Sequence, residues 1–129
     1  MNISYAIKLI PGYIGSNGRT EEEIANAEKE LDTSFANDYR EYLENIGLAC
    51  FESRELTGLT KTARLDVVSV TKEQRMLNQR IPRDWYVIEE THLDGIVIWQ
   101  SPSGGIYRAV ADAPARKIYD SLMSYVATI

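Results

Sequence analysis

Three strand-like segments joined by short connections, within residues 85–110, constrain the fold of this 129-residue chain most strongly. Residues 85–90, 96–100 and 106–110 are rich in Ile, Val, Trp and Tyr, the residue types that favour pleated strands. The connections contain Asp94-Gly95 and then 101-SPSGG-105, which are turn-forming sequences. Connections this short join only antiparallel neighbours, so the segment predicts an antiparallel meander.

Two helices are predicted ahead of these strands. The first, at residues 20–32, begins with Thr20 and Glu23 in the spacing of a capping box. The second, at residues 37–47, is expected to be capped by Asn37 or Asp38 and to end at Gly47 in the left-handed conformation. Its apolar face consists of residues at i, i+3, i+4 and i+7, namely Tyr39, Tyr42, Leu43 and Ile46.

The remaining segments complete the predicted fold. Residues 3–10 fit a strand and a helix equally well, and residues 11–18 have the composition of a loop. Further predicted elements are strands at 55–60 and 66–70, a helix at 71–79 capped by Thr71 with Gln74, and a closing helix at 115–129. We therefore expect an α+β fold, with a mainly antiparallel sheet of about five to six strands and helices packed on one face or end. The length is that of a single domain, residues 1–129.

The charge distribution favours a basic protein as partner over a nucleic acid. The net charge is −5, and residues 1–55 carry 11 acidic and 5 basic side chains, a net charge of −6. Such a surface disfavours nucleic-acid binding, which needs a basic face, and it suits a basic protein partner. The first residues lack the pattern of a signal peptide and no window is apolar enough to span a membrane, so we expect a cytoplasmic protein without membrane contact. Cys50 is the single cysteine and is expected to be a small buried residue.

The stretch from residue 89 to residue 110 contains residue types that occur in active sites. It holds the single histidine, His92, near Glu89, Glu90 and Asp94, and the pair Gly104-Gly105. The glycines precede a strand and no lysine follows them, so they indicate a hairpin turn instead of a phosphate-binding loop. One histidine with one cysteine rules out most zinc patterns, and Glu89 and Glu90 are expected to point to opposite faces of a strand, so without a bulge they cannot both bind a metal from one surface. We predict that His92 is an exposed loop residue and that the chain has no catalytic residue, cofactor or metal.

An ordered set of segments along the whole chain carries a family resemblance. The segments are 21-EEEIANAEKELDTSFANDYREYLENIG-47, 58-GLTKTARLDVVSVTKEQRMLNQ-79, 82-PRDWYVIEE-90, 94-DGIVIWQ-100, 104-GGIYRAV-110 and 121-SLMSYV-126. In this order and spacing they resemble the SUKH superfamily of small α+β proteins, although the chain departs from the family pattern at Phe35-Ala36 and at Ile46-Gly47-Leu48. The resemblance implies a helix at residues 3–10.

The resemblance also implies a function. Most bacterial members are thought to be immunity proteins that bind and block polymorphic toxins, such as nucleases, and a fungal branch is linked to cell-wall synthesis and signalling. We therefore expect a non-enzymatic immunity protein that occludes the active site of a cognate, basic protein toxin. A regulatory or scaffold protein linked to cell-wall or signalling processes is the alternative, and a small enzyme using the His92 region is the third possibility.

Two acidic patches are the expected partner-binding residues. One lies after the second helix and consists of Glu52 and Glu55 beside Phe51. The other consists of Glu89, Glu90 and Asp94 at the sheet edge and turn, with Trp99 as an aromatic contact. The oligomeric state stays open between a monomer and a weak dimer.

Overall fold

The computed structural model describes residues 2–111 and 113–129, which form five α-helices, one 3-10 turn and seven strands. The helices are α1 (Ile3–Lys8), α2 (Glu21–Leu31), α3 (Asn37–Asn45), α4 (Val67–Leu77) and α5 (Leu122–Val126), with the 3-10 turn η1 at Ala63–Leu65. The strands are β1 (Ile14–Gly15), β2 (Ala49–Phe51), β3 (Arg54–Glu55), β4 (Tyr86–Glu90), β5 (Ile96–Gln100), β6 (Ile106–Val110) and β7 (Arg116–Tyr119). These elements confirm the predicted α+β class.

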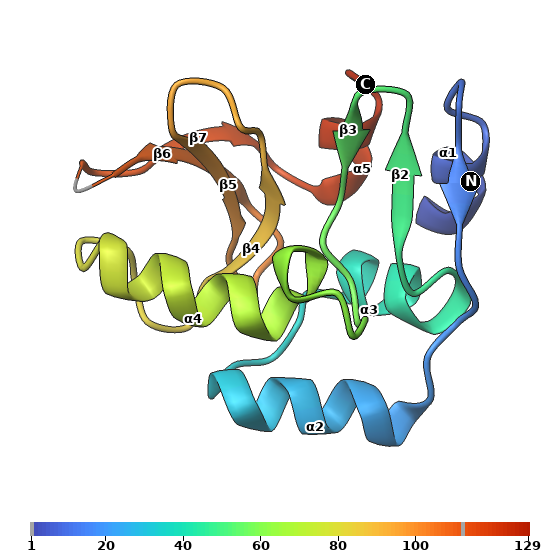
Figure 1. Ribbon diagram of the computed structural model, residues 1–129, viewed down its shortest axis with the longest axis horizontal. Helices are drawn as coiled ribbons and strands as arrows, with labels where there is room; N and C mark the ends of the chain where they lie inside the picture. The colour runs from blue at the N-terminus through green and yellow to red at the C-terminus, as the bar shows by residue number, and fades with distance from the viewer. Residues whose placement is uncertain (1, 112) are drawn as a thin grey trace.

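The strands form two antiparallel sheets instead of one, with the orders β1-β2-β3 and β4-β5-β6-β7. The predicted meander of three strands is confirmed, and β7 extends it to four. Figure 1 shows the four-stranded sheet on the left, the three-stranded sheet with α1 on the right, and α2 and α4 below. Helix α5 lies between the two sheets in this view. Among the described residues, no helix is both long and apolar enough to cross a membrane.

The two helices predicted ahead of the strands are confirmed as α2 and α3, except that the N-cap of α3 differs from the prediction. Thr20 and Glu23 form the capping box of α2, with both of its hydrogen bonds present. Gly47 follows α3 with a φ of 78°, as expected, and a Cβ there would lie 2.3 Å from the Asn17 carbonyl oxygen. The N-cap of α3 is Ala36 instead of Asn37 or Asp38. The Asp38 carboxylate instead accepts the backbone N–H of Leu122 at 2.8 Å and so holds the start of α5.

The main core lies between the helices and one face of the four-stranded sheet. Its centre holds Tyr39, Tyr42 and Tyr86, which are all fully buried. Each hydroxyl has a hydrogen-bond partner: Tyr39 and the Thr57 hydroxyl at 2.9 Å, Tyr42 and the Thr57 carbonyl at 2.9 Å, and Tyr86 and the Gln100 side chain at 2.8 Å. The other face of the sheet packs a smaller apolar cluster under α4, consisting of Val70, Ile81, Val87, Val97, Trp99 and Ala109.

The prediction of a strand at residues 66–70 is wrong, because α4 already begins at Val67. Asp66 is its N-cap and accepts the Ser69 backbone N–H. The β-branched run had suggested a strand, but Val67, Val70 and Thr71 share one helix face and are buried. Thr71 is therefore not a cap but a buried contact, since its hydroxyl accepts the Val87 backbone N–H at 2.9 Å.

Two further boundaries differ from the prediction. The expected strand at 55–60 ends at Glu55, because Thr57 turns away and donates its backbone N–H to the Ile88 carbonyl at 2.9 Å. The expected closing helix at 115–129 is divided into β7 and the short α5. Residues 116–119 pair with the otherwise open edge of β6, and Ser121 then caps α5 by accepting the Ser124 backbone N–H. Residues 3–8 are helical, as the family resemblance implied.

Candidate functional site

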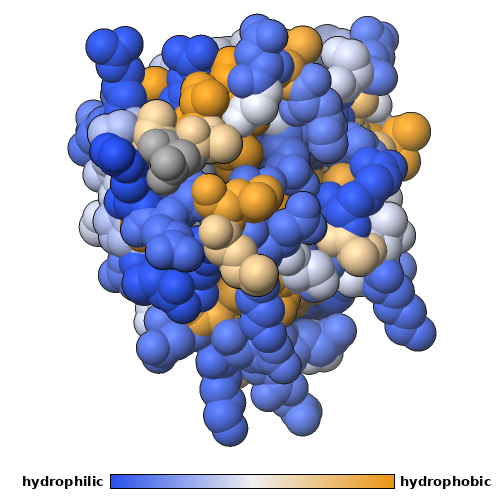
Figure 2. All heavy atoms as spheres, turned by 60° about the vertical axis from the view of Figure 1, so that its left-hand side comes forward, coloured by the Kyte–Doolittle hydropathy of each residue, from blue (hydrophilic) through white to orange (hydrophobic). Residues whose placement is uncertain are grey.

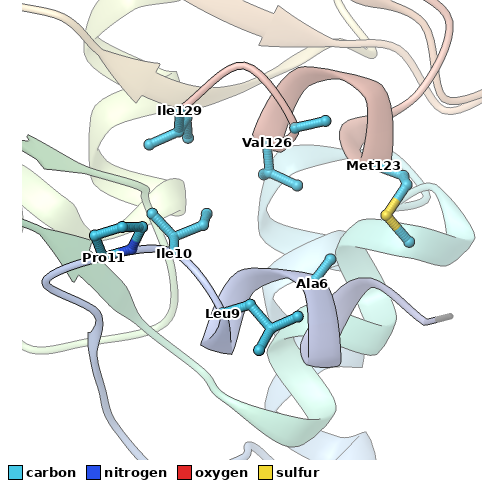
Figure 3. Close-up of a pocket in the computed structure, with 8 residues that line it drawn as sticks. Ala6, Leu9, Ile10, Pro11, Met123, Val126 and Ile129 are labelled. Atoms are coloured by element: carbon cyan, nitrogen blue, oxygen red, sulfur yellow. The ribbon is translucent and has the colours of Figure 1, made fainter.

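An open apolar groove runs between α1 and α5. Both helices turn small and aliphatic side chains toward it, and its volume is about 280 Å³. It is lined by Ala6, Leu9, Ile10, Pro11, Met123, Val126, Ala127 and Ile129. In Figure 3, Ala6 of α1 and Leu9, its C-cap, lie across the groove from Met123 and Val126 of α5, and Ile10, Pro11 and Ile129 gather at one end. Apolar pockets of this kind accommodate the side chains of a binding partner.

A second hollow of about 230 Å³ continues the groove toward the β2–β3 hairpin. The two hollows share Ile10, Pro11 and Ile129, so they adjoin. The hairpin contributes Phe51, Glu52, Ser53 and Arg54. Glu52 is exposed, and none of the described residues forms a hydrogen bond or ion pair with its side chain. The groove therefore ends beside an acidic group that is available to a partner.

A polar triad of Arg54, Glu89 and Tyr125 supports this end of the groove. The Arg54 guanidinium donates two hydrogen bonds to the Glu89 carboxylate, at 3.1 and 2.8 Å, and a third to the Tyr125 hydroxyl at 2.8 Å. The Tyr125 hydroxyl in turn donates to the same carboxylate. The triad joins β3, β4 and α5, so it fixes the β2–β3 hairpin against the four-stranded sheet and against α5, which lines the groove.

A β-bulge explains why Glu89 points toward Arg54. Val87 lies opposite Trp99 and Glu89 opposite Ile98, so two steps along β4 match one step along β5. A bulge turns a side chain to the other face of a strand. Glu89 thereby faces the main core on the side of Ile98, whereas in regular register it would face α4 on the side of Trp99.

The environment of the triad shifts two pKa values. The hydrogen bonds to Glu89 raise the pKa of the Arg54 guanidinium, because they favour its charged form. Burial raises the pKa of the Tyr125 hydroxyl, and the negative charge of Glu89 raises it further. At neutral pH the triad therefore contains a charged arginine and a neutral tyrosine that donates its proton in a hydrogen bond.

Three of the predicted partner-binding residues are not on the surface. Trp99 is 1% exposed and packs in the cluster under α4, Glu89 is 2% exposed within the triad, and Phe51 is 7% exposed in the main core. Strand alternation and the bulge turn these three side chains inward, although Phe51 still lines the hollow beside the β2–β3 hairpin. Trp99 is a core residue of the cluster under α4.

The other four predicted residues are exposed or half-buried, and they differ in whether another side chain binds their carboxylate. Glu55 binds Arg64 through two hydrogen bonds, at 2.7 and 3.2 Å, and Glu90 accepts one from Gln74 at 3.1 Å. Glu52 and Asp94 are exposed and have no partner among the described residues. The pKa of the Glu55 carboxyl is lowered mainly by the hydrogen bonds from Arg64.

The histidine region does not form a catalytic arrangement within the described residues. His92 is exposed in the β4–β5 connection with a φ of 57°, as the loop prediction required. Glu89 is engaged by Arg54 and Tyr125 instead of facing His92. Residues 2–111 and 113–129 contain no group of three His, Cys, Asp or Glu side chains placed to hold a metal ion.

Sequence reasoning did not find the α1–α5 groove. Residues 3–10 had been ambiguous, and the closing helix had been predicted too long for its exposed face to be recognised. A signal was present in 9-LIPG-12, where two aliphatic residues precede a helix-ending proline with no polar residue between them. Arg54 was also missed as the partner of Glu89, because a bulge leaves no mark in a single sequence.

A family model, SUKH_5, described as SMI1-KNR4 cell-wall, matches residues 8–129. A crystal structure of a protein from Pseudomonas syringae pv. tomato is similar with a TM-score of 0.78 and 14% sequence identity, over 98% of this chain and 95% of that chain. At this identity the likeness shows the fold alone. The comparison with curated proteins finds no match.

Proposed function

This chain belongs to the SUKH family of SMI1-KNR4 type, and we propose that it is an immunity protein, which binds a cognate polymorphic toxin domain in the cytoplasm and covers its active site. The family includes immunity proteins and SMI1/KNR4-like proteins and is generally non-catalytic. The binding function therefore requires a surface that can recognise another protein.

The α1–α5 groove is the observation that carries this proposal. Seven large apolar side chains are exposed among the described residues, and three of them come from the short stretch at residues 5–14. These three are Tyr5 at 55%, Leu9 at 60% and Ile14 at 68% exposure. Leu9 lines the groove, and exposed apolar side chains concentrated in one short stretch are typical of a protein-binding site. We propose that an apolar side chain of the toxin enters the groove.

Acidic residues around the hairpin supply the charge for a basic toxin. Glu52 at the end of the groove and Asp94 in the β4–β5 turn keep unpaired negative charges, and the net charge of the chain is −5. A toxin that acts on nucleic acid, such as a nuclease, carries a basic active site, which these charges attract and orient. Glu55 and Glu90 are further acidic residues that a basic partner could contact, although each already has an internal partner.

The test is co-expression with the C-terminal domain of the toxin encoded by the neighbouring gene. Wild-type protein should protect the cells and co-elute with that domain on size exclusion. Leu9→Arg places a charge in the groove and should abolish protection and lower affinity by about 100-fold, the typical effect of losing a central interface residue. Met76→Arg is the matched control, because Met76 is 77% exposed on α4, and this variant should protect like wild type.

The outcomes separate the proposal from its alternative. Cell death in the presence of wild-type protein, with no complex on size exclusion, contradicts the immunity function for that toxin. If the gene has no toxin neighbour, the description of the family as cell-wall proteins favours a regulatory or scaffold protein. Equal protection by Leu9→Arg and by wild type would keep the immunity function but exclude the groove as the binding site.

A further inference from the structure

Arg108 of β6 and Arg116 of β7 lie directly opposite each other in the antiparallel pair. Residues opposite one another on neighbouring strands have Cβ atoms about 4.5–5.5 Å apart, so the two guanidinium groups share one small region of the surface. Both side chains are exposed. Two like charges in this position repel each other and destabilise the hairpin.

The repulsion is not relieved within the described chain. Arg40, Arg54 and Arg64 each form an ion pair with a glutamate. Arg108 and Arg116 have no ion-pair or hydrogen-bond partner among the residues that the structure describes, although the sequence holds 19 acidic and only 14 basic side chains. This arginine pair therefore lacks a counter-charge among the described residues, even though acidic side chains outnumber basic ones in the sequence.

The pair stands beside an open sheet edge. β7 is the last strand of the order β4-β5-β6-β7, and its outer backbone groups make none of the hydrogen bonds found between the described residues. Figure 1 shows β6 and β7 extending away from the body of the molecule, and Figure 2 shows that side of the surface as mainly hydrophilic with scattered apolar groups. An edge of this kind accepts an additional strand from another chain.

We infer that the β7 edge binds an extended acidic segment of a protein partner, with main-chain hydrogen bonds to β7 and carboxylates held between Arg108 and Arg116. Arginine binds carboxylates through paired N–H groups, and side chains at every second position of an added strand would reach the same face of the sheet. A nucleic acid fits less well, because it cannot form the ladder and because the net charge of −5 repels a polyphosphate. The inference does not depend on the α1–α5 groove, which lies on α1 and α5 and takes an apolar side chain.

The first test is an NMR titration of the labelled full-length chain. The probe is a peptide of about ten residues that alternates threonine with glutamate, which favours an extended strand with all carboxylates on one face. A threonine–lysine peptide and a single-stranded oligonucleotide of equal charge are the comparison ligands. The acidic peptide should shift the backbone amides of residues 106–108 and 116–119, and neither comparison ligand should do so. No shift with the acidic peptide, or an equal shift with the oligonucleotide, overturns the inference.

Paired variants then separate specific recognition from general charge. Arg108→Gln with Arg116→Gln should weaken peptide binding by about 10-fold or more, because two charge-assisted contacts are lost. The matched control is Lys29→Gln with Lys61→Gln, which removes two exposed positive charges elsewhere and should leave the affinity within about 2-fold of wild type. Equal weakening in both double variants would overturn the inference, since binding would then report only net charge.

A single charge reversal distinguishes binding from folding. Arg116→Glu places a carboxylate opposite Arg108 and replaces a repulsive pair with an attractive one. The variant should melt at a higher temperature than wild type while it loses the acidic peptide. Retention of wild-type affinity in this better-folded variant contradicts a role of the arginine pair in binding. If both arginines only protected the edge from self-association, the acidic peptide would not bind at all.

Discussion

Arg54 and Glu89 join the two sheets of this protein, since the Arg54 guanidinium of β3 donates two hydrogen bonds, at 3.1 and 2.8 Å, to the Glu89 carboxylate of β4. The two residues are 35 positions apart in the sequence. Glu89 is almost completely buried, and Arg54 lines the hollow that continues the groove. A contact inside the fold therefore sets the geometry of the proposed binding surface.

Loss of this pair should destabilise the fold. Glu89→Ala leaves the partly buried Arg54 guanidinium without its counter-charge, and we expect the free energy of unfolding to fall by about 3 kcal/mol in urea denaturation. Glu55→Ala breaks the more exposed pair with Arg64 and should cost less than about 1 kcal/mol. Equal losses in the two variants would show that the buried pair adds nothing beyond a surface ion pair.

Buried tyrosines should make the fold sensitive to alkali. Burial raises the pKa values of Tyr39, Tyr42, Tyr86 and Tyr125, whereas tyrosine in the unfolded chain ionises near pH 10. Above that pH the unfolded state loses protons that the folded state keeps, so stability is complete below it and falls as the pH rises. The expected decrease is about 1.4 kcal/mol per pH unit for each tyrosine.

Urea unfolding at a series of alkaline pH values checks this expectation. Tyr39→Phe should reduce the slope by the share of one tyrosine, although it also removes the hydrogen bond to Thr57. Tyrosinate absorbance from the buried residues should develop only together with unfolding. Its appearance while the chain remains folded would contradict the assigned burial.

Two glycines with similar backbone angles should differ in their tolerance of a side chain. Gly47 and Gly95 have φ values of 78° and 71°, so alanine is strained by about 1 kcal/mol at either position. A Cβ at Gly95 meets nothing within 4 Å, whereas at Gly47 it would lie 2.3 Å from a backbone oxygen and 2.6 Å from the Arg19 guanidinium. Gly47→Ala should therefore lower the melting temperature clearly more than Gly95→Ala, and equal melting temperatures would refute the close contact.

Trp99 should affect stability and not recognition. Trp99→Ala empties the centre of the cluster under α4 and should cost about 3–5 kcal/mol in the free energy of unfolding. Trp99→Phe fills more of the space and should cost less, while calorimetric titration of the folded variant gives wild-type affinity for the partner. Reduced affinity for the partner in a fully folded Trp99→Phe variant would show that Trp99 contributes to binding.

The sequence by itself determined the elements whose signals are local. The Thr20–Glu23 capping box, the left-handed Gly47 and the meander of β4, β5 and β6 were predicted, because caps, tight turns and strand alternation depend on residues a few positions apart. The exposed loop position of His92 followed in the same way. The family resemblance added the helix at α1, which periodicity alone had left open.

Only the tertiary structure decided the remainder. Residues 67–70 have strand propensity but form a helix, because packing of Val67 and Val70 against the core outweighs the small differences in local preference. Residues 116–119 become a strand because β6 offers an open edge. Glu89 is buried because a bulge turns it toward Arg54, so a residue predicted to contact a partner lies inside the fold. In each case contacts between residues distant in the sequence contribute more free energy than the local pattern, and a single sequence records only the latter.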